Sequence, residues 1–202
     1  MGLAPAVRRF ALAVGLALSL SACGINSVPT AEENAKAKWA DVEAQFQRRA
    51  NLIPNLTEVT QGAAANERAI LTEVTEARAR ATSVNVTAAD LGNAEKMAEF
   101  QAAQAQIGAG IGRLLASFEA YPQIQSNQNF LALQSQLEGT ENRIAVAIRD
   151  YNEAVRQYNT TIRTFPDIIG AKVIHGAEPL VPYEAVTEGA EQAPQLDMTP
   201  NS

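Results

Sequence analysis

A chain of 202 residues, of which 47% are hydrophobic, is long enough to bury the core of one domain. Aromatic residues make up only 5%, and alanine and glutamine are plentiful, so the composition favours helices and argues against a β-sandwich or barrel. The 16 basic and 22 acidic residues give a formal charge of -6, which provides no basic field for a phosphate backbone and excludes nucleic acid as an expected partner.

The first 22 residues have the layout of a secretory signal. Arg8 and Arg9 precede the apolar stretch 10–20, and small residues follow it. A membrane-spanning helix needs about 20 apolar residues, and this stretch is shorter. We therefore expect export with cleavage, and the alternative is an uncleaved N-terminal helix that holds the chain in the membrane.

The only cysteine, Cys23, follows this signal directly. The residues Leu20, Ser21, Ala22 and Cys23 resemble the lipobox of bacterial lipoproteins, in which the cysteine becomes the new N-terminus and carries the lipid. The absence of a second cysteine leaves Cys23 without a disulfide partner within the chain, which fits a modified thiol. The resemblance implies lipid attachment at Cys23 and a location in the cell envelope outside the cytoplasm, periplasmic if the source is Gram-negative.

Helical periodicity covers most of the rest. Residues 23–30 are expected to form a linker, and apolar residues at spacings of three and four then predict one helix over 32–83, with a kink or an interruption near Pro54. Thr87 and Asp90 resemble a capping box and start a second helix over 88–121. A third is predicted over 126–164 and a short fourth over 166–176, while the acidic, proline-containing residues 178–202 are expected to be a disordered tail.

These elements predict an all-α fold, an elongated antiparallel bundle of three long helices plus a short C-terminal helix, with coiled-coil-like packing over residues 31–177. Counting levels along such a bundle places Arg49 and Glu141 about 20 Å apart, so they are not expected to pair. It also leaves residues 32–46 without cover. We expect that stripe, Trp39, Val42 and Phe46, to bind a partner helix or a second copy, unless the tail or a longer second helix covers it.

The residues that carry most enzyme chemistry are scarce. His175 is the only histidine, which excludes a ferritin-like di-metal site, and we expect it at the surface. The glycine run 108–112 lies inside a helical pattern with no preceding strand, so it is not a phosphate-binding loop, and we assign Gly108 and Gly112, with Ala98 and Ala105, to helix packing. Arg49, Glu67 and Glu141 are interpreted as register-fixing residues. We predict no catalytic residue, no metal and no cofactor.

Three sequence blocks resemble the LemA family. They are QFQRRANLIPNLTEVT at 45–60, TENRIAVAIRDYNEAVRQYN at 140–159, and VPYEA at 181–185. The resemblance implies a membrane-attached helical bundle of bacterial envelopes with no established enzymatic activity. Members often have an N-terminal transmembrane helix, whereas this chain has the lipobox, and Asn66 stands where the family motif commonly has histidine.

The sequence thus indicates a membrane-anchored envelope lipoprotein. We expect its bundle to act as a non-enzymatic binding or scaffolding module, held to the membrane by its N-terminal lipid and contacting an unidentified envelope protein or itself. A self-assembling membrane-remodelling protein is the alternative, and an enzyme is disfavoured because the sequence offers no nucleophile with a neighbouring base.

Overall fold

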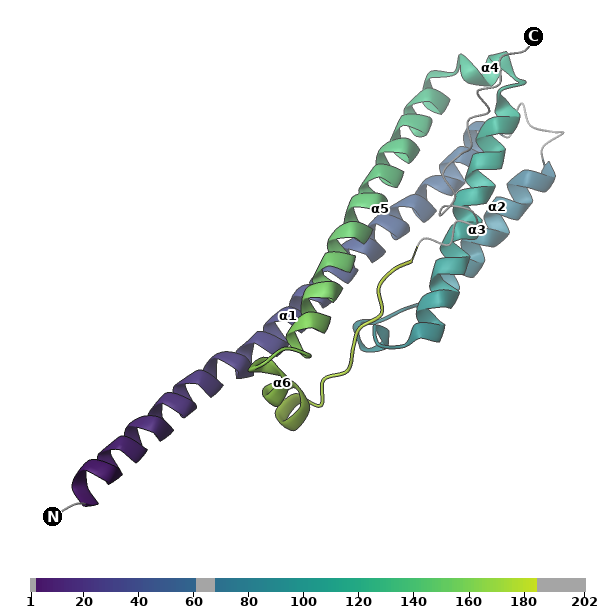
Figure 1. Ribbon diagram of the computed structural model, residues 1–202. Helices are drawn as coiled ribbons and strands as arrows, with labels where there is room; N and C mark the ends of the chain where they lie inside the picture. Colours follow the sequence, from purple (N-terminus) through teal and green to yellow (C-terminus); the bar gives the residue numbers. More distant parts are fainter. Residues whose placement is uncertain (1–2, 61–67, 185–202) are drawn as a thin grey trace, which may run out of the picture.

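The computed structural model describes residues 3–60 and 68–184, and the regular elements in those ranges are all helices, as predicted (Figure 1). Four of them are long. They are α1 (Leu3–Thr60), α2 (Arg68–Ser83), α3 (Ala94–Phe118) and α5 (Gln128–Thr161). The short ones are η1 (Ala88–Asp90), α4 (Pro122–Gln125), α6 (Asp167–Gly170) and the π-helical turn η2 (Ala171–His175).

The four long helices pack as an elongated bundle that differs from the predicted one. Helix α5 runs antiparallel to α1, since Lys38 faces Asp150 and Arg49 faces Glu141. Helix α2 runs antiparallel to α3, because Arg113 pairs with Glu73 while Gly110, three residues earlier on α3, lies against Val74, one residue later on α2. The prediction of three long helices is therefore wrong: two antiparallel pairs form the bundle, and the N-terminal part of α1 projects beyond it (Figure 1).

The single helix predicted over 32–83 is divided into two. Helix α1 ends at Thr60 and α2 returns alongside α3, so the chain reverses between them. Helix α1 itself continues through Pro54. Proline lacks the N–H that would bond to the carbonyl four residues earlier, that of Ala50. Here the Nε of Arg78 on α2 donates to that carbonyl at 2.8 Å, so tertiary contact supplies the missing donor.

Residues 24–30, expected as part of a linker, are helical and belong to α1. Val28 is fully buried, and it packs with Tyr158 and Ile162 from the end of α5 and with Ala171 of η2. Burial of an apolar side chain stabilises a helix through packing, which local propensity does not reveal. The bundle therefore begins at about Val28 and not after Thr30.

The predicted capping box is confirmed but starts a shorter element. The backbone N–H and the hydroxyl of Thr87 both donate to the Asp90 carboxylate, at 3.0 and 2.7 Å. They open the 3₁₀ turn η1, and α3 begins only after Asn93. The Asn93 side chain accepts from the N–H groups of Glu95 and Lys96, which satisfies two donors that a helix start leaves unpaired.

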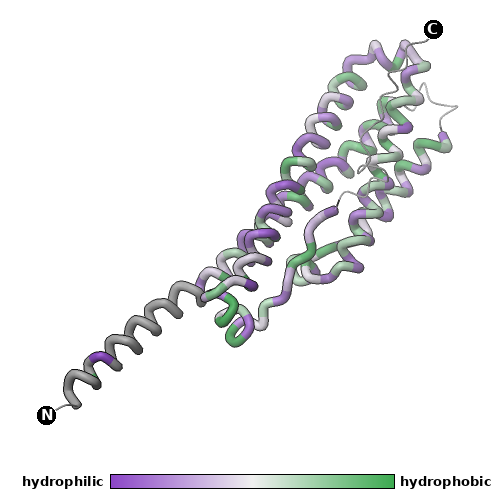
Figure 2. The backbone as a smooth tube through the Cα atoms, viewed as in Figure 1, coloured by the Kyte–Doolittle hydropathy of each residue, from purple (hydrophilic) through white to green (hydrophobic). Residues whose placement is uncertain are grey.

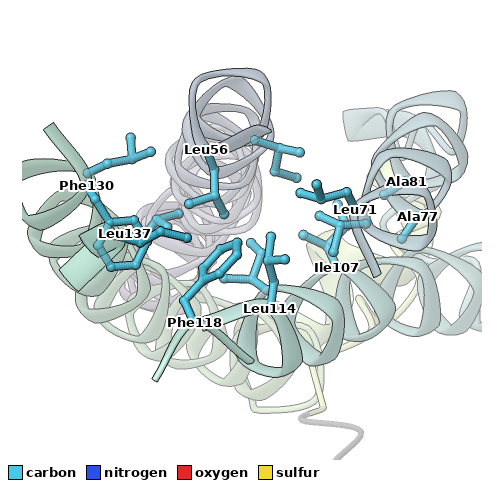
Figure 3. Close-up of a cluster of buried hydrophobic side chains, with 14 of the residues drawn as sticks. Leu56, Leu71, Ala77, Ala81, Ile107, Leu114, Phe118, Phe130 and Leu137 are labelled. Carbon is cyan, nitrogen blue, oxygen red and sulfur yellow. The ribbon is translucent and has the colours of Figure 1, made fainter. Parts of the chain in front are cut away.

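One half of the core lies at the end where α1 stops. Figure 3 shows Leu56 of α1 between side chains of α5 and α2, with Leu114 and Phe118 of α3 pointing toward it. The rings of Phe118 and Phe130 meet edge-on, with centroids 5.6 Å apart. All four long helices contribute to this cluster, so the core holds both antiparallel pairs together.

The glycine run contributes to packing at a residue other than those expected. Gly110 is buried, and a Cβ added there would lie 3.0 Å from the Val74 side chain, so its small size permits the close approach of α2. The predicted face of small residues is mostly solvent-exposed, because Ala98, Ala105 and Gly112 lie at the surface. Gly108 lies beside the Arg49 guanidinium.

The start of the expected tail is part of the fold. Residues 177–184, here called the C-terminal segment, run without regular structure along the bundle, and Leu180, Val181 and Tyr183 pack on its core. The amide of Asn152 exchanges two hydrogen bonds with the backbone of Tyr183, both at 2.8 Å. The amide of Asn159 does the same with Leu180, at 2.8 and 2.9 Å. Residues 185–202 lie outside the described residues.

We predict that Asn159→Asp detaches this segment. The new carboxylate oxygen would face the Leu180 carbonyl, to which the amide now donates. We therefore expect the free energy of unfolding to fall by about 1–3 kcal/mol. Hydrogen exchange at the Leu180 amide should rise, and the melting temperature should fall. Asn51→Asp is the matched control, because exposed Asn51 only accepts from Gln47 and an aspartate keeps that acceptor. Equal effects of the two changes would mean that the segment is not held by Asn159.

Candidate functional site

The stripe predicted to bind a partner is buried inside the chain. Trp39, Val42 and Phe46 are 1%, 0% and 4% exposed. The Trp39 ring lies 5.4 Å from that of Phe100 on α3 and 5.1 Å from that of Tyr151 on α5, and its indole N–H donates to the Val86 carbonyl at 2.8 Å. The prediction of a docking stripe is wrong, because α5 runs beside this part of α1 and covers it.

The C-terminal segment also covers this stripe, which agrees with the stated alternative that the tail folds over it. Tyr183 stacks on Phe46 with ring centroids 5.8 Å apart. The Tyr151 hydroxyl donates to the Val181 carbonyl at 2.8 Å, and the Val181 N–H donates to the Leu91 carbonyl at 2.9 Å. Burial raises the pKa of Tyr183 to about 12, and it raises that of Tyr151 as well, so both phenols stay neutral at physiological pH.

A charged side chain, Arg49, lies in the middle of the bundle and is 4% exposed. One guanidinium nitrogen, Nη1, donates to both oxygens of Glu141 at 3.2 and 3.4 Å. The other, Nη2, donates to the backbone and side-chain oxygens of Gln104, each at 2.8 Å. The guanidinium also lies 4.9 Å from the Phe46 ring centroid. The group thus joins α1, α3 and α5.

The prediction that Arg49 and Glu141 do not pair is wrong. It assumed a third helix parallel to the first, whereas α5 is antiparallel to α1 and brings residue 141 level with residue 49. These contacts agree with the interpretation that the polar residues fix the helix register. The guanidinium bonds to a single residue on each neighbouring helix, Gln104 on α3 and Glu141 on α5. Glu67 lies outside the described residues. Two isolated polar residues in apolar seams were the available signal for this pair.

A cleft of about 490 Å³ lies beside this cluster, between α1, the end of α2 and α3. Its ionisable lining residue is Glu43, and partial burial raises the pKa of that carboxyl. The other polar groups are amides and a hydroxyl, from Gln47, Asn85, Gln104 and Thr82. The described lining thus offers one carboxylate, several amides and a hydroxyl, which can bind polar groups.

Metal chemistry has no evident place in the part of the chain that the structure describes. No group of three or more histidine, cysteine, aspartate or glutamate side chains there is arranged to hold a metal ion. His175 ends the turn η2 and is exposed, in agreement with the expectation of a surface residue.

The proposed lipid-attachment residue, Cys23, lies on the backbone of α1 four residues before Ser27. Ser27 connects α1 to α6, because its hydroxyl donates to the Asp167 carboxylate. Attachment of lipid to Cys23 stays a prediction. Across the described residues, none of the helices is both long enough and apolar enough to pass through a bilayer.

Residues 38–198 match the model of the LemA family. Magnetosome proteins MamQ 1 and MamQ 2 of Paramagnetospirillum magneticum (strain AMB-1) are each 30% identical over 158 residues, which is 70% of this chain and 58% of theirs. Magnetosome protein MamQ of Magnetospirillum gryphiswaldense is 28% identical over 157 residues, with the same two shares. The chain therefore spans less than two thirds of the length of these relatives.

Proposed function

Because the chain belongs to the LemA family, we propose that it is a membrane-anchored protein of the bacterial cell envelope whose helical bundle acts as a non-enzymatic binding or scaffolding module. The observation that carries this proposal is the continuity of α1. One helix passes from residue 23, where the proposed mature chain begins, through the bundle to Thr60. A membrane anchor at its start would connect the bundle directly to the membrane surface, which is what a membrane-attached module requires.

Two further features support a structural role. Arg49 is held by Glu141 and Gln104, so its charge is used within the bundle and is not presented to a substrate. The neighbouring cleft supplies one carboxylate among amides, a set suited to binding polar groups of a partner.

For the anchor, we propose cleavage after residue 22 and lipid on Cys23, as the lipobox-like residues 20–23 indicate. The mature chain loses two arginines and no acid, so 16 minus 2 basic residues against 22 acidic residues give -8. Attraction of so acidic a chain to anionic lipid is weak, and two or more acyl chains are needed for stable attachment. The uncleaved N-terminal helix is the alternative mode.

We predict that Cys23→Ala prevents processing. Mass spectrometry of the membrane-bound wild type should find an N-terminal peptide that begins at Cys23 and carries acyl chains, whereas the variant should keep residues 1–22. Ser19→Ala, inside the apolar stretch, is the control and should be processed normally. An unmodified Cys23 in the wild type, with residues 1–22 still attached, would contradict the lipid anchor and favour the uncleaved helix.

Scaffolding is tested by crosslinking in cells and identification of the attached proteins. A defined partner recovered with the wild type supports the binding module. If the purified chain instead forms large regular oligomers on liposomes and alters their shape, the protein is a self-assembling membrane-remodelling protein, and the binding proposal is wrong.

A further inference from the structure

Four large apolar side chains gather at one end of the bundle. Phe165, Ile169, Val173 and Ile174, here called the basal patch, are 78%, 56%, 78% and 56% exposed. Figure 2 shows this hydrophobic turn, α6 and η2, at the foot of the bundle beside α1. Single exposed apolar residues are ordinary, but four within ten residues form a patch of the kind that marks an interaction surface.

The turn that carries the patch is held firmly from its other side. Ala171 is fully buried and packs with Val28 of α1, and the Asp167 carboxylate accepts from Ser27. The Ala177 N–H donates to the Ala171 carbonyl at 2.9 Å, which closes the turn. The apolar side chains are therefore presented outward by a packed element.

The position of the turn on α1 identifies what the patch faces. Cys23 is four residues before Ser27, so along the helix axis the two lie only about 6 Å apart at 1.5 Å per residue. A lipid on Cys23 places the bilayer surface at this level of the molecule. An uncleaved apolar segment over 10–20 would also enter the membrane from this end.

From this juxtaposition we propose that the basal patch inserts into the headgroup–acyl boundary of the membrane that holds the N-terminus. The inference rests on the proposed N-terminal attachment and deepens it, because it assigns a second membrane contact. Exposed Arg163 and Lys172 flank the patch, and their long side chains reach lipid phosphates while the apolar groups enter the acyl region. Asp167 is already bonded by Ser27.

The consequence is a fixed orientation. A lipid chain at Cys23 alone permits the bundle to tilt. Insertion of the basal patch adds a second point of contact with the membrane, and two points of contact restrict the orientation of the bundle. Insertion depends on apolar contact, since the chain is acidic overall. It should therefore occur on vesicles of phosphatidylcholine alone as well as on vesicles that also contain phosphatidylglycerol.

The experiment uses the full processed protein, extracted from membranes and reconstituted into such vesicles. An environment-sensitive fluorophore is attached at Val173→Cys, and mass spectrometry verifies the labelled site. Leu131→Cys is the matched control, because Leu131 is also apolar and 50% exposed but lies near the start of α5, at the other end of the bundle. On vesicle-bound protein, nitroxide lipids should quench the label at 173 severalfold more than the label at 131, and aqueous iodide should show the opposite order.

The outcomes separate this inference from the anchor. If iodide quenches the labels at both sites equally on vesicle-bound protein, insertion is overturned while the anchor stands. If the 173 label is then shielded only in native membranes, the basal patch binds a membrane protein and not the lipid. A shielded label on a chain whose Cys23 is unmodified supports insertion and refutes the lipid anchor. Failure of the full chain to bind vesicles overturns both.

Discussion

Ile144→Asp is expected to unfold the bundle or to destabilise it by about 4 kcal/mol or more. Ile144 is 5% exposed and lies on α5 in the cluster that contains Trp39 and Phe46. An aspartate there loses the apolar contacts and buries a carboxylate. Arg49, the one charged side chain among the buried residues that the structure describes, already donates to Glu141 and Gln104. A loss of that size is comparable with the whole stability of many domains.

Val146→Asp is the matched control for this change. Val146 lies two residues further along the same helix and is 46% exposed, so the same carboxylate remains in water there. Circular dichroism should find the helical content and melting temperature of Val146→Asp close to wild type, and those of Ile144→Asp strongly reduced. Similar melting temperatures for both variants would mean that the face of α5 assigned to the core is wrong.

Trp39→Ala is expected to cost about 3–5 kcal/mol, the usual range for removal of a large buried aromatic side chain. It removes ring contacts with Phe100 and Tyr151 and the hydrogen bond to the Val86 carbonyl. Trp39→Phe keeps an aromatic ring and removes only the indole donor. We therefore expect it to cost less, and chemical denaturation of the three proteins measures the difference.

A triple substitution tests the assignment of Trp39, Val42 and Phe46 to the core. Their burial predicts that simultaneous replacement by serine lowers the stability of the purified chain in the absence of any partner. If stability were preserved while crosslinked partners disappeared, the three residues would act as an interface. That outcome would contradict the packing of Tyr183 on Phe46.

If the basal patch inserts into the membrane, the contacts between the helices determine how the rest of the bundle is oriented above it. The C-terminal segment joins α5, through Asn152 and Asn159, to the Leu91 carbonyl in the turn before α3. The Arg49 group joins α1, α3 and α5 at mid-height. Such cross-connections keep the orientation set at the foot of α1 along the rest of the bundle, and they are what a scaffold needs.

The sequence by itself determined that the fold is all-helical and where most of the long helices lie. Spacings of three and four predicted long helices over 88–121 and 126–164, and α3 and α5 lie within those ranges. The capping residues Thr87 and Asp90 form the predicted contact. These features are local, because helical periodicity and capping depend on residues within one or two turns of each other.

Only the tertiary structure decided which helix covers which face. The sequence between Thr60 and Arg68 is rich in alanine, a strong helix former, so local propensity did not mark the reversal that separates α1 from α2. That reversal makes α5 antiparallel to α1, brings Glu141 to Arg49 and covers Trp39. An apolar stripe indicates that a face is buried but does not indicate which element covers it. The hydrophobic effect is non-directional, so the packing of the whole chain determines the partner.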